Sequence, residues 1–69
     1  MSMLEDISDR LAQHTLKKIE GVEESTLQRK VADAIGNSSP TLQEAYNTAM
    51  RIRKAEKAAM DVIESYTGE

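Results

Sequence analysis

The sequence has no cysteine, tryptophan or phenylalanine, and its only aromatic residues are Tyr46 and Tyr66. Disulfides therefore cannot support this 69-residue chain, although small domains often need support because they bury only a limited core. A single histidine and no cysteine also exclude a zinc site built from those two residue types. We expect one small domain over residues 1–69, with a core of Leu, Ile, Val, Met and Ala, that gains stability by self-association.

Long apolar runs are missing as well. No segment approaches the roughly 20 apolar residues of a membrane span, and the N-terminal segment is acidic and has no signal-peptide pattern. The absence of cysteine is compatible with a reducing cytosol. We expect a cytoplasmic protein with no membrane partner.

Features that indicate an enzyme are absent too. The sequence has no glycine-rich phosphate loop, and its serines have no base placed near them by sequence. Carboxylates alternate with Lys and Arg on helix faces, as solubility requires. We expect a binding protein with no cofactor, no metal and no catalytic residue. The net charge of −3 argues against a surface that is basic all over, although a local basic patch would suffice for nucleic acid.

The spacing of apolar residues predicts an all-α fold. A first helix is expected over about residues 3–20, with Ser2 and Glu5 as a capping box and Gly21 as its stop. Its apolar face comprises Leu4, Ile7, Leu11, Thr15 and Ile19, with Ala12 and Leu16 at the edge. A second helix is expected over about residues 26–35, with Ser25 and Gln28 as its capping box.

A third, long helix is predicted over about residues 40–66. Ser39 and Pro40 suit an N-cap and the first helical position, and no further proline or glycine occurs before Gly68. Two short helices cannot cover such a length, so residues 50–66 are expected to pair with a second chain. Small alanines would let that helix approach closely. The expected interface comprises Ile52, Ala55, Ala59, Val62, Ile63 and Tyr66.

Residues 28–47 combine the end of the second helix, a glycine turn and the start of the third helix. The pattern V-A-x-x-x-G-x-S-x-x-T-L begins at Val31, and Asn47 follows five residues after its leucine. The segment resembles the helix-turn-helix of bacterial regulators, especially the lac repressor family. It departs from that family at Asn37, where an apolar residue is usual. Gly36 is expected to adopt the left-handed conformation of a helix end.

The resemblance implies a bacterial or phage transcription regulator that binds double-stranded DNA as a homodimer. The third helix would enter the major groove, where Gln43 and Asn47 could contact adenine and Glu44 could contact cytosine. Backbone phosphates would be held by residues around the turn. The predicted DNA-binding set is Arg29, Lys30, Ser38, Ser39, Thr41, Gln43, Glu44 and Asn47.

Other interpretations remain open. A helical corner with no nucleic-acid role would give the same pattern, and the long Ala- and Met-containing helix could belong to an adaptor or inhibitor that binds a larger protein. A run of charged residues such as the basic cluster from Arg51 to Lys57 is usually the solvated face of a helix. Residues 14–17, H-T-L-K, resemble the core of histidine phosphotransfer domains, which would make His14 a phosphate acceptor, but Lys18 stands where that family has glycine.

Overall fold

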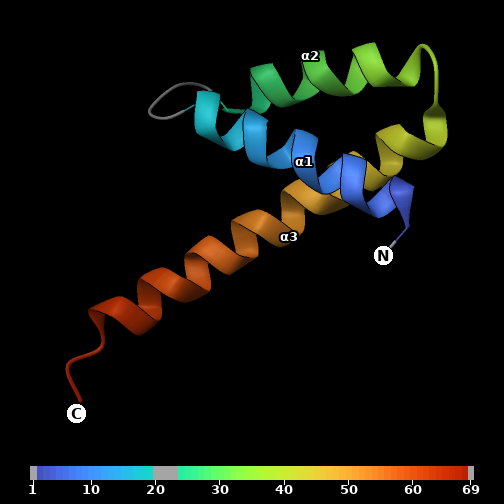
Figure 1. Cartoon of the computed structure of the whole chain (residues 1–69). Helices are drawn as coiled ribbons and strands as arrows, with labels where there is room; N and C mark the ends of the chain where they lie inside the picture. The colour runs from blue at the N-terminus through green and yellow to red at the C-terminus, as the bar shows by residue number, and fades with distance from the viewer. Residues whose placement is uncertain (1, 20–23, 69) are drawn as a thin grey trace.

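The structure, a computed structural model, describes residues 2–19 and 24–68, which form three helices. These are α1 (Met3–Lys18), α2 (Glu24–Gly36) and α3 (Pro40–Ser65). Within these two ranges there is no strand, so the predicted all-α class is confirmed. The molecule is elongated, 50 × 30 × 14 Å, because α3 extends well beyond the other two helices (Figure 1).

The first helix begins as predicted and ends earlier. The Glu5 amide donates to the Ser2 hydroxyl at 3.1 Å, and the Ser2 amide donates to the Glu5 carboxylate at 3.3 Å, which completes the capping box. The helix stops at Lys18, two residues before the predicted end, and Ile19 caps it by donating its amide to the Thr15 carbonyl. The predicted stop at Gly21 lies outside the described residues.

The predicted N-cap of the second helix is wrong. Helix α2 begins at Glu24, so Ser25 already has helical backbone, whereas an N-cap residue is non-helical.

The expectation for Gly36 is also wrong. Gly36 is the last residue of α2, and it does not have the positive φ of a left-handed residue. The chain turns through residues 37–39, held by the Ser38 and Ser39 amides, which donate to the Ile35 carbonyl at 3.0 and 2.8 Å. The Gln43 side chain lies where a side chain at Gly36 would begin: a Cβ at this position would lie 2.6 Å from the Gln43 side-chain nitrogen and would displace that amide. The N-cap of α3 is confirmed, since the Leu42 amide donates to the Ser39 hydroxyl at 3.1 Å.

The core is small and centres on Tyr46 and Met50 of α3, both fully buried. Around them pack Ala12, Ala32 and Ala49, with Leu11, Leu16, Val31 and Ile35 partly buried at the margin. Alanines on all three helices leave the space that the tyrosine ring and the methionine side chain fill.

The buried face of α1 agrees with the predicted one only in part. Thr15 and Ile19 are buried as predicted, but Ala12, predicted at the edge, and Ser8, which was not predicted, are also buried, whereas Leu4 is 37% exposed. The helix is turned so that Thr15 reaches Tyr46. Their hydroxyl oxygens lie 2.8 Å apart in the interior. This contact accounts for a buried hydroxyl on α1, and the burial of Ser8 in place of Leu4 could not be predicted from apolar spacing alone.

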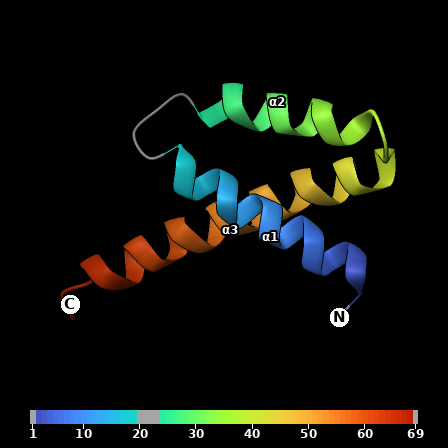
Figure 2. The same cartoon turned by 45° about the horizontal axis from the view of Figure 1, so that its top comes forward.

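Helix α1 packs across α3, and α2 runs back alongside the N-terminal half of α3, as Figures 1 and 2 both show. Helices α1 and α2 hardly touch each other, so α3 holds the fold together. Beyond the contacts that Arg53 and Lys54 make with α1 and α2, the long helix leaves this cluster and its C-terminal end extends without a covering helix (Figure 2). The expectation that two short helices cannot cover α3 is therefore confirmed.

Candidate functional site

The predicted DNA-binding residues do not form one exposed surface. Arg29, Lys30, Ser38, Thr41 and Glu44 are exposed. The Ser39 hydroxyl is already used as the N-cap of α3. Of these, Ser38 and Thr41 lie at the α2–α3 turn, Arg29 and Lys30 lie in the middle of α2, and Glu44 brings a negative charge to the first turns of α3.

The two residues expected to contact adenine face α2 instead, which corrects the prediction that they are exposed. The Gln43 side-chain amide donates to the Ala32 carbonyl at 2.9 Å and covers Gly36. The Asn47 oxygen accepts from the Gln28 amide at 3.2 Å. Both side chains are half-buried. Residues on one side of α3 meet α2 because that helix runs back alongside it.

Two members of the basic cluster join helices. Arg53 forms a two-pronged ion pair with Asp9 of α1, with Nε–Oδ1 and Nη2–Oδ2 distances of 2.7 Å. Lys54 donates to the Gln28 oxygen of α2 at 3.1 Å. The hydrogen bonds from Arg53 and then Gln13 hold the pKa of Asp9 below its ordinary value. Arg53 and Lys54 therefore make contacts between helices, whereas the side chain of Lys57 is 78% exposed and pairs with Asp61 of its own helix.

The outer face of α3 carries a row of exposed apolar and small side chains. Its residues alternate at spacings of four and three, and we call them the outer stripe: Thr41, Ala45, Thr48, Ile52, Ala55, Ala59, Val62 and Tyr66, with Ile63 at the edge. All are exposed except half-buried Ala45. The large members Ile52, Val62 and Ile63 are 63–68% exposed. At 100° per residue the stripe lies opposite Tyr46 and Met50.

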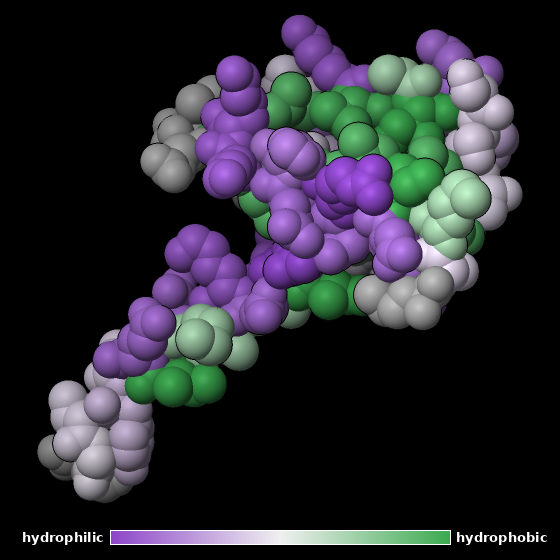
Figure 3. All heavy atoms as spheres, viewed as in Figure 1, coloured by the Kyte–Doolittle hydropathy of each residue, from purple (hydrophilic) through white to green (hydrophobic). Residues whose placement is uncertain are grey.

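This stripe contains every residue predicted for the interface, and the structure leaves all of them accessible. Figure 3 shows apolar side chains on the extended half of α3, away from the cluster of three helices. Spacing of four and three residues is the pattern of a two-helix seam. The geometry can therefore accept a second helix along α3.

A groove adjoins the N-terminal half of the stripe, where α1 and α3 diverge. This N-terminal groove, about 630 Å³, is lined by Leu4, Glu5, Ser8 and Asp9 of α1 and by Thr41, Glu44, Ala45, Thr48, Ala49 and Ile52 of α3. Its floor is apolar, and carboxylates stand at its rim. Sequence periodicity did not predict it, because the exposure of Leu4 follows from the rotation of α1.

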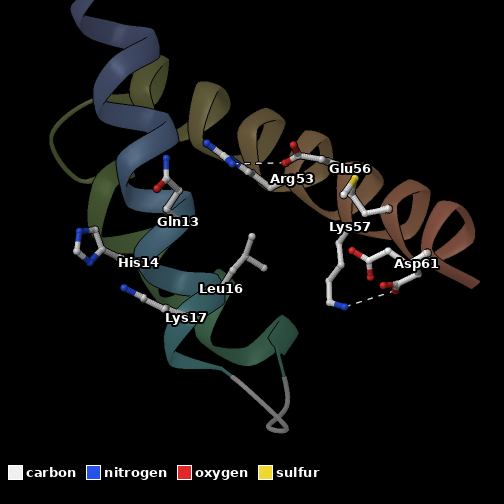
Figure 4. Close-up of a pocket in the computed structure, with 10 residues that line it drawn as sticks. Gln13, His14, Leu16, Lys17, Arg53, Glu56, Lys57 and Asp61 are labelled. Atoms are coloured by element: carbon white, nitrogen blue, oxygen red, sulfur yellow. Dashed lines mark hydrogen bonds and ion pairs between the residues drawn. The ribbon is translucent and has the colours of Figure 1, made fainter.

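A second groove lies on the other side of the crossing, between residues 13–17 of α1 and residues 53–64 of α3. It has a volume of about 580 Å³ and contains charges of both signs (Figure 4). His14 and Lys17, the pair that resembles a phosphotransfer core, are exposed at its edge. On the α3 side Lys57 lies 3.4 Å from Asp61, and Arg53 lies 3.4 Å from Glu56. The cations on this side are thus matched by carboxylates of the same helix.

Neither groove assembles a recognisable reaction centre. Over residues 2–19 and 24–68, no three His, Asp or Glu side chains converge as metal ligands would. No described helix is long and apolar enough to cross a membrane. Comparison of the chain with protein-family models, curated proteins and solved structures finds no match.

Proposed function

We propose that this chain is a binding protein that acts by pairing the outer stripe of α3 with another apolar helix. The observation that carries the proposal is the exposure of Ile52, Val62 and Ile63 on the same face of α3, opposite the core. Isolated exposed apolar residues are ordinary, but a contiguous apolar surface commonly marks an interaction site.

The free energy available favours this use of the stripe. A covered side chain of this size loses about 100 Å² of accessible surface, which corresponds to roughly 2.5 kcal/mol at about 25 cal/mol per Å². Three such residues outweigh an exposed ion pair, which contributes about 0–1 kcal/mol. The dominant interaction of this surface is therefore apolar, so binding should vary little with salt.

Site-specific photocrosslinking tests the proposal. A benzophenone amino acid replaces Ile63 in the stripe or, as a control, Ala34, which is exposed on α2. Both proteins are irradiated in the cells that produce the chain. We expect discrete protein adducts from position 63 and none of the same mass from position 34. Equal adducts from both positions, or none from position 63, would contradict the proposal.

DNA binding is a second candidate. It is supported by the helix-turn-helix resemblance and by the exposure of Arg29 and Lys30 on α2 and of Thr41 at the start of α3. In this function Gln43 and Asn47 would keep their contacts with α2, and the exposed residues would touch the duplex.

Selection from a random duplex pool at low salt tests it, followed by salt titration of any enriched site. A steep loss of affinity with salt, reduced by replacing Arg29 and Lys30 together with alanine, would support phosphate contact. The absence of enrichment from folded protein would refute DNA binding and leave the helix-pairing function untouched.

A further inference from the structure

We infer that the helix covering the outer stripe is α3 of a second copy of this chain, running antiparallel with Ile52 of one copy beside Ala55 of the other. The inference rests on the proposed helix-pairing function and names its partner. The symmetry is two-fold, so each copy presents the same surface and covers the same surface of the other.

The sizes of the side chains favour this alignment. Ile52 meets Ala55 of the second copy, and the symmetric contact repeats this pair. By the same register Val62 meets Ala45 and Ala59 meets Thr48. Each layer thus combines a small residue with a residue of equal or larger size, so two helices can stay at an even separation along the seam. A parallel pair would instead place isoleucine on isoleucine in one layer and alanine on alanine in the next.

Charges at the seam select among the antiparallel registers. With Ile52 beside Ala55, Arg51 lies opposite Ala58 of the second copy, and no like charges meet. A shift of one heptad in one direction would bring Arg51 against the same arginine, and a shift in the other direction would bring Glu56 against the same glutamate. A parallel pair would gain an Arg51–Glu56 contact, but exposed ion pairs contribute little. Antiparallel helix dipoles also attract.

The area is adequate for a modest dimer. The exposed large and small members of the stripe offer roughly 600 Å² per copy, near the ~800 Å² per partner of a standard interface and above most crystal contacts. The C-terminal half of each α3 would also lie along the N-terminal groove of the other copy and cover Leu4.

Cysteine crosslinking tests the register without background, because the chain has no cysteine of its own. Thr48→Cys and Ala59→Cys proteins are treated with a short bismaleimide, separately and as an equal mixture. We expect a covalent dimer from the mixture at least five-fold more abundant than from either protein alone. Crosslinking of each protein alone, with no gain on mixing, would show a parallel pair and overturn the inference.

Sedimentation equilibrium over a range of concentrations tests the second copy itself. The wild-type chain should be dimeric at high concentration, and Ile52→Lys should weaken association at least ten-fold with unchanged helicity. Ala34→Lys, an equal change at an exposed position of α2, should have no effect. A wild-type chain that stays monomeric overturns the inference. Adducts from position 63 with a different protein would then still support the proposed function, whereas no adducts would refute both.

Discussion

Replacing Thr15 with valine should destabilise the fold more than replacing Tyr46 with phenylalanine, although both changes remove the same hydrogen bond. The Thr15 hydroxyl donates its only proton to the Leu11 carbonyl at 2.9 Å, so Tyr46 must donate in the 2.8 Å contact between the two hydroxyls. Tyr46→Phe leaves Thr15 with its own acceptor. Thr15→Val leaves the donor of a fully buried tyrosine without one.

The magnitudes follow from that asymmetry. Loss of an ordinary hydrogen bond costs about 1 kcal/mol, and a buried unsatisfied group costs about 1–3 kcal/mol. We expect the free energy of unfolding to fall by about 1 kcal/mol for Tyr46→Phe and by about 2 kcal/mol for Thr15→Val. The double variant should lose no more stability than Thr15→Val alone, because it leaves no donor unsatisfied. Each kcal/mol lowers the Tm of a domain of this size by about 4–8 °C.

Urea unfolding followed by circular dichroism at constant m-value measures these differences. Since self-association would add stability, all variants are compared at one low protein concentration. Additive effects of the two changes, or a larger cost for Tyr46→Phe than for Thr15→Val, would refute the assignment of Tyr46 as donor.

The pKa of Tyr46 reports on the same contact in its ionised state, in which the phenolate oxygen can only accept and the Thr15 hydroxyl turns from the Leu11 carbonyl to donate to it. Burial raises the pKa of Tyr46 above its ordinary value of 10.0, and the hydrogen bond with Thr15 partly opposes that rise. In a Tyr66→Phe background only Tyr46 contributes to the ultraviolet titration, and Thr15→Val should move its midpoint higher. Above pH about 10, Tyr46 keeps its proton in the folded state but releases it in the unfolded chain, so the stability of the fold should decrease as the pH rises further.

Two further predictions concern contacts between helices. Arg53 lowers the pKa of Asp9, so their ion pair should stabilise the fold above pH about 3.8, the pKa of the unfolded state, and this contribution should be lost as the pH falls through the folded-state pKa. The difference in urea midpoint between wild type and Asp9→Asn should therefore be larger at pH 6 than at pH 2.5. An equal difference at the two pH values would contradict the prediction. Gly36→Ala should change the unfolding free energy by less than about 0.5 kcal/mol, because two effects oppose each other. Alanine is the better helix former, but its Cβ displaces the Gln43 side-chain amide from the Ala32 carbonyl. In a Gln43→Ala background the same change should stabilise by about 0.5–1 kcal/mol, and a destabilisation there would show that Gly36 is needed for its backbone.

Local sequence determined the three helices and most of their ends. Caps and helix dipoles act within a few residues, so Ser2, Ser39 and Pro40 could be interpreted without knowing the fold. The excess length of α3 was equally visible, because no breaker interrupts it and its partners are short. The exposure of Val62 and Ile63, near the C-terminal end of α3, follows from that mismatch in length.

Tertiary packing decided which side of each helix is buried. Along α3 the sequence places Leu42, Ala45, Ala49 and Ile52 at steps of three and four, and it cannot say that Ala49 enters the core while Ile52 faces outward. That division depends on where α1 crosses, and at this crossing Tyr46 contacts Thr15, which lies 31 positions away in the sequence.

The same crossing determined the role of polar residues. Gln43 and Asn47 carry amides that could contact a base or a neighbouring helix, and local sequence does not distinguish the two. Their bonds to α2 exist because that helix runs back alongside α3. Arg53 and Asp9 are 44 positions apart in the sequence, and they form their ion pair because α1 crosses α3. Contacts between residues so far apart in the sequence depend on the path of the whole chain, whereas helix caps and apolar periodicity depend only on residues close in the sequence.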